Sequence, residues 1–391
     1  MMNTLSATPA PGATGGKKST TSNDNAIATS KKTSNDDPTS NTGSDTHISK
    51  VKTLFSGILG GGENNNTHGS NRRISATYRL GESMRSIIRG TTSADDVERN
   101  KNIQNNLEEA VAKLNEELNL LASKSAGTGA EAEALMEALK RDANCEAEDS
   151  LLISDMDKRC FLRSIVGNNG NDACFDIKLA LKRMITNWEF RLKIFGKDLA
   201  YMPLTLDGAL RNDILTLESD FVRVLEDVYD DSGRGILFVS PSKFIKQQHN
   251  PLSMVRTIWY HVHVLLEYEN VQKNGFIILV NPKNVSLNNI SYELQKLAAY
   301  SGDKCFPTTI QAFHFCQPNY IFRVLELPFM KYFLGPILSA RINVNGKDQM
   351  IEKLEKHYGI PPTCIPTDIS GGQLALKDQK VWLQERRQSG K

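Results

Sequence analysis

The clearest pattern in the second half of the chain is an alternation of short apolar runs with stretches of helical periodicity. Three runs have the length of strands: GILFV at residues 235–239, GFIILV at 275–280 and TTIQAFHFC at 308–316. Between them, apolar residues recur every three or four positions over 252–266 and 291–300, which predicts helices. Connections of this length suit parallel crossovers, so the order predicts a βαβαβ unit. We therefore expect an α/β fold with a mostly parallel sheet flanked by helices.

Two amphipathic stretches precede these strands. Residues 94–141 are rich in Glu, Lys and Asn and carry one apolar stripe, formed by Ile103, Leu107, Val111, Leu114, Leu118 and Leu121. A second helical pattern covers residues 175–195 and includes Trp188 and Phe195. We expect an α-helical subdomain at 93–200, in which the 94–141 helix is a possible site for a protein partner.

The first 92 residues have a different composition. They consist mainly of Ser, Thr, Asn, Gly and Asp, with too few large apolar residues to offset the entropy of ordering, so we expect a disordered tail. Two segments interrupt it: residues 47–62 predict a short amphipathic helix, and residues 71–90 carry five arginines. The second segment favours either transient contact with an anionic membrane surface or a solvated linker.

Residues 320–334, YIFRVLELPFMKYFL, are apolar on nearly every side. A helix of this kind is either buried in a core or acts as a lid over something apolar that comes and goes. Pro328 should kink this helix or end its first half.

Composition and candidate chemistry narrow the function. The 391 residues carry a net charge of only +2, which argues against a dedicated nucleic-acid binder. The sequence has no glycine-rich nucleotide-binding motif between a predicted strand and the helix that follows it, so we expect no cofactor. Cys305, His314 and Cys316 lie close in sequence, but without a fourth ligand or a close pair we expect packing roles rather than a metal or catalytic site. The chain also lacks a secretory signal and a membrane-spanning apolar run, so we expect a cytoplasmic protein.

Several short motifs occur in a recognisable order. They are RCFLRSIV with NWEFRLKIF, then DDSGRGILFV, GFIILVNP, CFPTTIQAFHFCQP, MKYFLGPILSARINVNG and IPTDISGG. Together they resemble the CRAL-TRIO lipid-binding domain family over about residues 150–375. Two departures stand out: Pro318 lies one place early after the last of the three strands, and Lys331 one place late.

The resemblance implies an apolar lipid cavity lined by the sheet, with residues 320–334 as its gate. The side chains expected to contact lipid are Ile277, Leu279, Phe313, Phe315, Ile321, Phe322, Leu325, Phe329 and Phe333. Basic residues near the gate of phosphoinositide-binding relatives correspond here to Arg163, Lys331 and Arg341, which we take as candidate headgroup contacts. Other basic positions of those relatives are uncharged here, so a neutral or zwitterionic ligand stays equally open.

We therefore expect a non-enzymatic lipid-binding or lipid-transfer protein that touches membranes peripherally and takes a phospholipid or isoprenoid ligand. Two alternatives remain open: a lipid-sensing adaptor without bulk transfer, and a Cys/His-dependent enzyme. The expected organisation is a disordered tail at 1–92, a helical subdomain at 93–200, a CRAL-TRIO domain at 201–375 and a C-terminal helix or tail at 376–391.

Overall fold

The structure, a computed structural model, describes residues 94–123, 132–145, 151–165 and 175–391. The tail expected at residues 1–92, with its amphipathic and basic segments, lies outside the described residues. The first described helices are α3 (Ala94–Ser123), α4 (Glu133–Ala143), α5 (Asp155–Arg163) and α6 (Ile177–Phe195).

A five-stranded sheet follows, in the order β1-β2-β3-β4-β5. Its strands are β1 (Val222–Tyr229), β2 (Gly235–Val239), β3 (Phe276–Val280), β4 (Ile310–Cys316) and β5 (Ile342–Asn345). Strands β2 to β5 pair in parallel, and β1 is antiparallel to β2. The α/β fold with a mostly parallel sheet is confirmed, and β1 and β5 extend the three strands that the apolar runs predicted.

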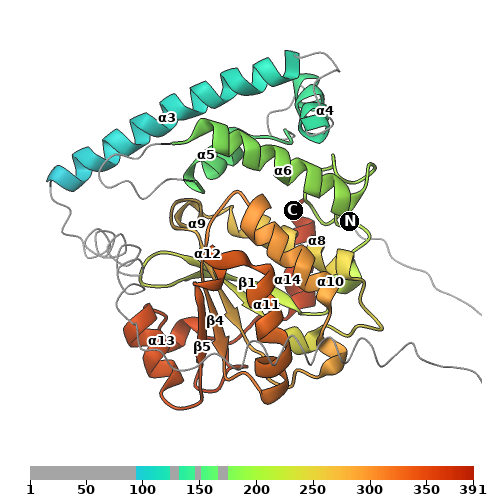
Figure 1. Ribbon diagram of the computed structural model, residues 1–391, viewed down its shortest axis with the longest axis vertical. Helices are drawn as coiled ribbons and strands as arrows, with labels where there is room; N and C mark the ends of the chain where they lie inside the picture. The colour runs from blue at the N-terminus through green and yellow to red at the C-terminus, as the bar shows by residue number, and fades with distance from the viewer. Residues whose placement is uncertain (1–93, 124–131, 146–150, 166–174) are drawn as a thin grey trace, which may run out of the picture. The chain divides into compact units, whose positions relative to one another are not determined.

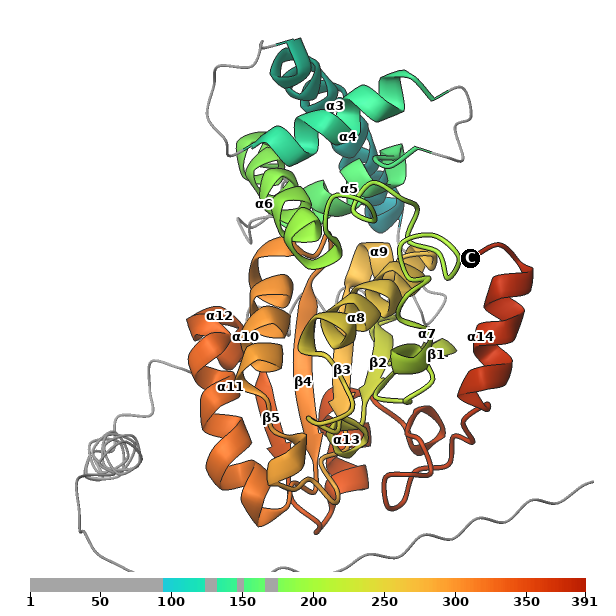
Figure 2. The ribbon, with the colours of Figure 1, turned by 90° about the vertical axis from the view of Figure 1, so that its right-hand side faces the viewer.

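Helices cover both faces of this sheet. On one face lie α8 (Pro251–Leu265) and α10 (Tyr292–Tyr300), which share a core with Leu237, Phe276 and Phe313. On the other face α13 (Met350–Tyr358) packs through Met350 and Leu354. Figure 2 shows α8 and α10 in front of the strands and α13 behind them. Double coverage explains why the strands read as continuous apolar runs rather than as an alternating pattern.

The predicted 94–141 helix is divided into α3 and α4. Its apolar stripe is buried inside the chain, where Leu107, Val111, Leu114 and Leu118 pack with residues of α4, α5 and α6. Helix α5 begins at a capping box, in which the Ser154 and Asp157 side chains each bond to the other residue's backbone N–H. Most of the stripe is thus packed inside the chain, while Ile103 and Leu120 stay exposed on α3, and a protein partner at this helix remains a prediction.

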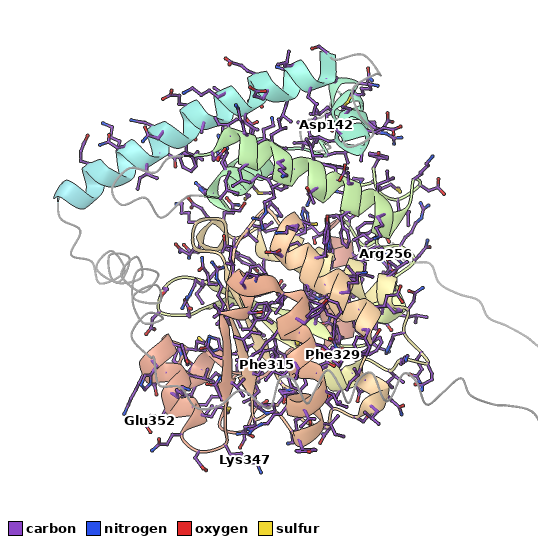
Figure 3. All side chains as sticks on the ribbon, viewed as in Figure 1. Asp142, Arg256, Phe315, Phe329, Lys347 and Glu352 are labelled. Atoms are coloured by element: carbon purple, nitrogen blue, oxygen red, sulfur yellow. The ribbon has the colours of Figure 1, made fainter. Side chains whose placement is uncertain are left out.

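Polar contacts join these helices to the sheet-containing part. The Asn187 side chain on α6 donates to the carbonyl of Cys305 at 3.0 Å, and Arg183 donates to the carbonyl of Phe306 at 2.9 Å. A buried ion pair anchors α8: the Arg256 guanidinium donates to both carboxylate oxygens of Asp213 at 2.6 and 2.7 Å and to the carbonyl of Ile194. Arg256 is labelled in Figure 3. These contacts fix α6 and α8 relative to each other.

Two short helices and the C-terminal helix complete the fold. The short helices α7 (Ile214–Leu217) and α9 (Glu269–Asn274) flank α8, and α14 (Gln379–Gln388) lies beside β1 (Figure 2). On α14, Arg386 pairs with Glu267 at 2.5 Å and donates to the Tyr260 hydroxyl on α8 at 3.3 Å. The C-terminal helix is therefore held to the body of the domain by a part-buried ion pair.

Candidate functional site

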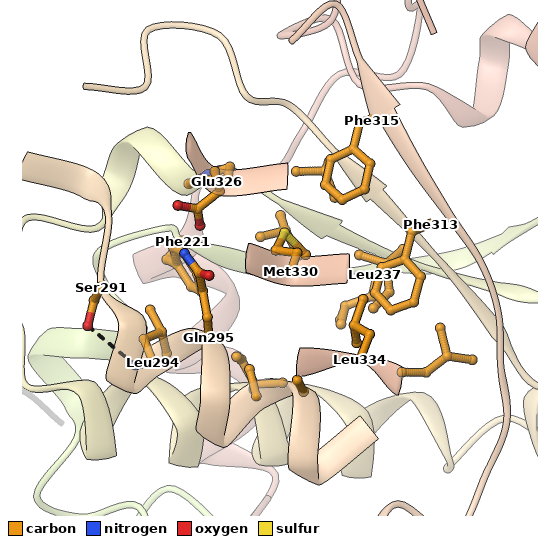
Figure 4. A pocket seen from close by; sticks show the side chains of 18 of the residues that line it. Phe221, Leu237, Ser291, Leu294, Gln295, Phe313, Phe315, Glu326, Met330 and Leu334 are labelled. Atoms are coloured by element: carbon orange, nitrogen blue, oxygen red, sulfur yellow. Dashed lines mark hydrogen bonds between the residues drawn. The ribbon is translucent and has the colours of Figure 1, made fainter. Parts of the chain in front are cut away.

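An apolar cavity lies between the sheet and the helices that follow β4. It encloses about 970 Å³ of empty space, a volume that includes space open to solvent. Figure 4 shows it from close by, with Phe313 and Phe315 on one side and the gate residues Met330 and Leu334 beside them. A cavity with this lining is suited to an apolar molecule.

The floor of the cavity is set by the register of the sheet. Ile278 on β3 is paired with Leu237 on β2 and with Phe313 on β4, and all three line the cavity. Residues paired across a sheet point to the same face, and the next residue along each strand points to the other. The neighbouring row, formed by Ile236, Ile277 and Ala312, accordingly belongs to the core under α13. One face of the sheet is open for a ligand, and the other is filled.

The gate consists of a π-helical turn at Phe322–Glu326, helix α11 (Leu327–Phe333) and helix α12 (Gly335–Ser339). Pro328 lies in the first turn of α11, directly after the π-helical turn. Proline lacks an N–H and clashes with a preceding carbonyl, so the α-helical hydrogen-bond pattern is interrupted before it. Gly335 joins α11 to α12 with a φ of +68°, a backbone conformation that is unfavourable for residues other than glycine. The helix expected over 320–334 is thus broken into segments.

Aromatic contacts hold the gate over the cavity. The Phe329 ring on α11 packs edge-on against Tyr292 of α10 with centroids 4.2 Å apart, and Phe322 packs on Phe315 of β4 at 5.2 Å. Phe315 and Phe329 are labelled in Figure 3, and Figure 1 shows α11 beside α10. The gate is therefore closed by ring packing, without an ion pair between it and the body among the described residues.

The turn between β4 and the gate has a defined hydrogen-bond pattern. Asn319 accepts from the N–H of Phe322 at 2.9 Å and donates to the carbonyl of Val285 at 2.8 Å. Gln317 has a φ of +53°, which is uncommon for a residue other than glycine. Asn319 thus caps the gate and ties it to the loop after β3.

Two polar side chains face the apolar cavity. Glu326 ends the π-helical turn, Gln295 lies on α10, and each is only 8% exposed. Burial raises the pKa of Glu326 to about 7, an effect that nearby Gln295 partly offsets. The Glu326 Oε2 atom and both polar atoms of the Gln295 side chain have no hydrogen-bond partner among the described residues.

The expected lipid contacts fall into three groups. Phe313, Phe315 and Phe322 line the cavity. Ile277 and Leu279 are fully buried on the opposite face of the sheet, in the core under α13. The remaining gate residues are half-buried and do not line the cavity: Ile321, Leu325, Phe329 and Phe333. Contact with a lipid itself stays a prediction for all of them.

The three candidate headgroup residues are not brought together in one contact. Lys331 is exposed on α11, Arg163 ends α5, and Arg341 donates to the carbonyl of Ile310, a lining residue. Sequence reasoning missed Arg183 on α6, which bonds to the carbonyl of the lining residue Phe306. Burial lowers the pKa of Arg183, and the positive charge of Arg341 adds to the effect. A headgroup role for Arg163, Lys331 and Arg341 remains a prediction.

The cysteine and histidine side chains lie in environments that suppress their chemistry. Burial raises the pKa values of Cys305 and Cys316 to about 12 and lowers that of His314 to about 3. Near neutral pH, neither a thiolate nor an imidazolium forms readily at these positions. His314 packs against the Tyr358 ring of α13, whereas Cys305 lies beside α6. Within the described ranges, no three His, Cys, Asp or Glu side chains gather as a metal site.

Sequence reasoning also missed part of the cavity wall. Lining residues come from β2, from α10 and from the loops around them, and include Phe221, Val239, Leu294 and Ala299. Their helical or strand pattern was visible, but a pattern that marks a buried face does not distinguish a packed core from the wall of a cavity.

Among the described residues, no helix is long and apolar enough to cross a membrane.

Comparison with known proteins identifies the family that the sheet-containing part of the chain resembles. Residues 224–371 match the family model of the CRAL/TRIO domain, so the resemblance seen in the sequence motifs is confirmed. The chain is 29% identical over 170 residues to Clavesin-1 of Xenopus laevis, covering 42% of this chain and 49% of that protein. It is 27% identical over 170 residues to Alpha-tocopherol transfer protein-like of Homo sapiens, covering 42% and 47%. The chain thus spans about half the length of the curated relatives it matches. The crystal structure of Sfh5 aligns with a TM-score of 0.40 and 10% identity, over 72% of this chain and 98% of that one.

Proposed function

We propose that this chain, whose residues 224–371 match the CRAL/TRIO domain family, binds a hydrophobic lipid in the cavity and carries or presents it between membranes. The observation that most supports this is the apolar lining of the cavity, which lies under a gate held by ring packing. The name of the related Alpha-tocopherol transfer protein-like points to transfer by that protein and adds support.

The energetics of burial favour uptake without an energy source. Each buried methylene is worth about 0.8 kcal/mol, so a chain of about fourteen methylenes gains on the order of 11 kcal/mol when it leaves water. A bilayer offers a similar gain, so exchange between the bilayer and the cavity is nearly balanced. The gate is needed because an open cavity would expose the bound chain to water during transit.

The outer surface of the gate suits contact with a membrane. Apolar and aromatic side chains are exposed there: Tyr320, Val324, Tyr332 and Ile337. Arg323 and Lys331 are also exposed on the same segment. Aromatic and apolar groups insert into the headgroup region, and cations are attracted to anionic lipids. A gate that binds the membrane surface would open where the lipid can leave.

Lipid uptake is the direct test of this proposal. After incubation with vesicles of mixed cellular lipids, the full-length protein should retain about one lipid per chain, measured by organic extraction and mass spectrometry. It should also speed the movement of that lipid from donor to acceptor vesicles above the spontaneous rate. A protein that takes up no lipid contradicts the proposal; uptake without any faster transfer leaves only presentation or sensing.

Charging the outer surface of the gate should weaken membrane binding. Tyr332 and Ile337 are 79% and 67% exposed, so the double variant Tyr332→Glu with Ile337→Glu should fold normally. Each buried side chain of this size contributes about 1.5–3 kcal/mol, so we expect at least a tenfold loss in vesicle co-sedimentation. Leu215→Glu, at an 83% exposed residue of α7, is the matched control and should bind as the unmodified chain does. Equal loss in the control would argue against a gate-specific surface.

A further inference from the structure

The cavity contains one polar spot in an otherwise apolar lining. Glu326 and Gln295 come from the gate and from α10, and Figure 4 shows their polar ends turned towards each other on one side of the pocket. Both side chains are more than nine-tenths buried. Glu326 Oε2, Gln295 Oε1 and Gln295 Nε2 have no hydrogen-bond partner among the described residues.

Unpartnered buried polar groups are rare in folded proteins and call for a physical reason. The other polar residues of the lining already have structural roles. Asn289 donates to the carbonyls of Ser242 and Phe244, and Ser291 caps α10 by accepting from the N–H of Leu294. The Gln295 side chain interacts with Glu326 and partly lowers its pKa, yet three polar atoms of this pair have no hydrogen-bond partner among the described residues. Their open hydrogen-bonding positions are therefore available to whatever occupies the cavity.

The chemistry of this pair discriminates between classes of ligand. A carboxylate accepts hydrogen bonds, and a glutamine amide both accepts and donates. Burial raises the pKa of Glu326 to about 7, which shows that negative charge is already disfavoured at this spot. An anionic group would bring a charge to a spot where burial disfavours charge, and a plain hydrocarbon would leave the polar atoms unpaired. A hydroxyl group can donate to Glu326 and accept from the Gln295 amide at the same time.

We propose that Glu326 and Gln295 select a ligand whose buried end is an uncharged hydroxyl group, as in a long-chain alcohol or a phenol. This inference rests on the proposed function, because it requires the cavity to hold a hydrophobic ligand. It adds the chemical class of the group that the cavity recognises.

Ligands that differ only at the head can test this. The full-length protein is incubated with phosphatidylcholine vesicles that contain equal trace amounts of hexadecanol, hexadecyl methyl ether, hexadecylamine and palmitic acid. The protein is then recovered, extracted and assayed by mass spectrometry. The apolar chain is the same in all four probes, so differences in uptake report the head group. We expect the alcohol to exceed the methyl ether about tenfold, the size of one hydrogen bond to a polar or charged partner.

Substitutions at Glu326 should change this preference selectively. Glu326→Leu should take up alcohol and ether almost equally, while Glu326→Gln should keep part of the preference because its carbonyl still accepts. Glu293→Gln, at an exposed residue of the same helix as Gln295, is the matched control and should behave as the unmodified chain does. Thermal unfolding of each variant verifies that it is folded before uptake is compared.

The possible outcomes separate this inference from the proposed function. Equal uptake of the four probes, or a preference that survives in Glu326→Leu, would overturn the inference and leave lipid binding standing. Preferred uptake of the amine would overturn it in favour of an ion pair with Glu326. Uptake of none of the probes, together with no lipid from cellular vesicles, would overturn the proposed function and the inference with it.

Discussion

Replacing Ile278 with tryptophan should lower the lipid recovered with the protein about a hundredfold while the chain keeps its fold. Ile278 lies in the middle of the cavity floor, between Leu237 and Phe313. An indole ring there would occupy space that the ligand chain needs. Excluding three or four methylenes at about 0.8 kcal/mol each accounts for a loss of this size. Mass spectrometry of extracted lipid gives the occupancy, and thermal unfolding of lipid-free protein gives the stability.

Ile277→Trp is the matched control, one residue earlier on the same strand. Ile277 is fully buried in the core under α13, where it is paired with Ile236 and Ala312. Overpacking a filled core typically costs about 1–3 kcal/mol, so this variant should lose stability while its folded fraction still binds lipid. If Ile278→Trp retained its lipid and Ile277→Trp lost it, the ligand would lie on the other face of the sheet.

Asn319→Ala should release bound lipid about 30 times faster than the unmodified chain. The substitution removes the cap on the N–H of Phe322 and the tie to the carbonyl of Val285. The lost cap and the lost hydrogen bond each destabilise the closed gate by about 1 kcal/mol. A total of about 2 kcal/mol corresponds to a change of about 30-fold in the release rate. The rate can be followed with a fluorescent lipid displaced into excess vesicles, alongside hydrogen exchange over residues 320–334.

Two further variants sharpen this experiment. Asn319→Asp can still accept from the N–H of Phe322 but cannot donate to the carbonyl of Val285. Its release rate should therefore lie between those of the unmodified chain and Asn319→Ala. Asn288→Ala removes an exposed asparagine side chain from the neighbouring loop and should change nothing. If Asn319→Ala left the release rate unchanged while exchange in the gate rose, the gate would not be the barrier that retains the ligand.

Much of the fold could be predicted from the sequence because the central strands are apolar on both faces and separated by helical spacing. The apolar runs at 235–239, 275–280 and 308–316 correspond to β2, β3 and β4. Strand β1 was missed because VRVLEDVY carries three charges, and part of this edge strand is exposed. Strand β5 is only four residues long, too short for periodicity to identify without a family pattern.

The continuous apolar character that identified the strands gave no information about which of their residues line the cavity. Because β3 is apolar at every position, its sequence cannot show whether Ile277 or Ile278 faces the cavity. That choice depends on what covers each face, namely α13 on one side and the gate on the other. The sequence of β4 offered Phe313 and Phe315 on one face, and the cavity lies on that face. For Glu326, nothing in the local sequence indicates that its carboxyl points inward.

The gate is also the connection between two neighbouring strands of the sheet. Residues 317–341 run from the end of β4 to the start of β5, and these strands pair along their length, with Phe313 opposite Ile342. A segment fastened at both ends cannot swing outward like a flap on a single pivot. It can only change its own shape, with Gln317 at one end and Gly335 near the other as the positions of unusual backbone geometry. The amplitude of its motion is therefore limited. Because both ends stay attached to the sheet, the gate can return to the same closed conformation after each lipid is released.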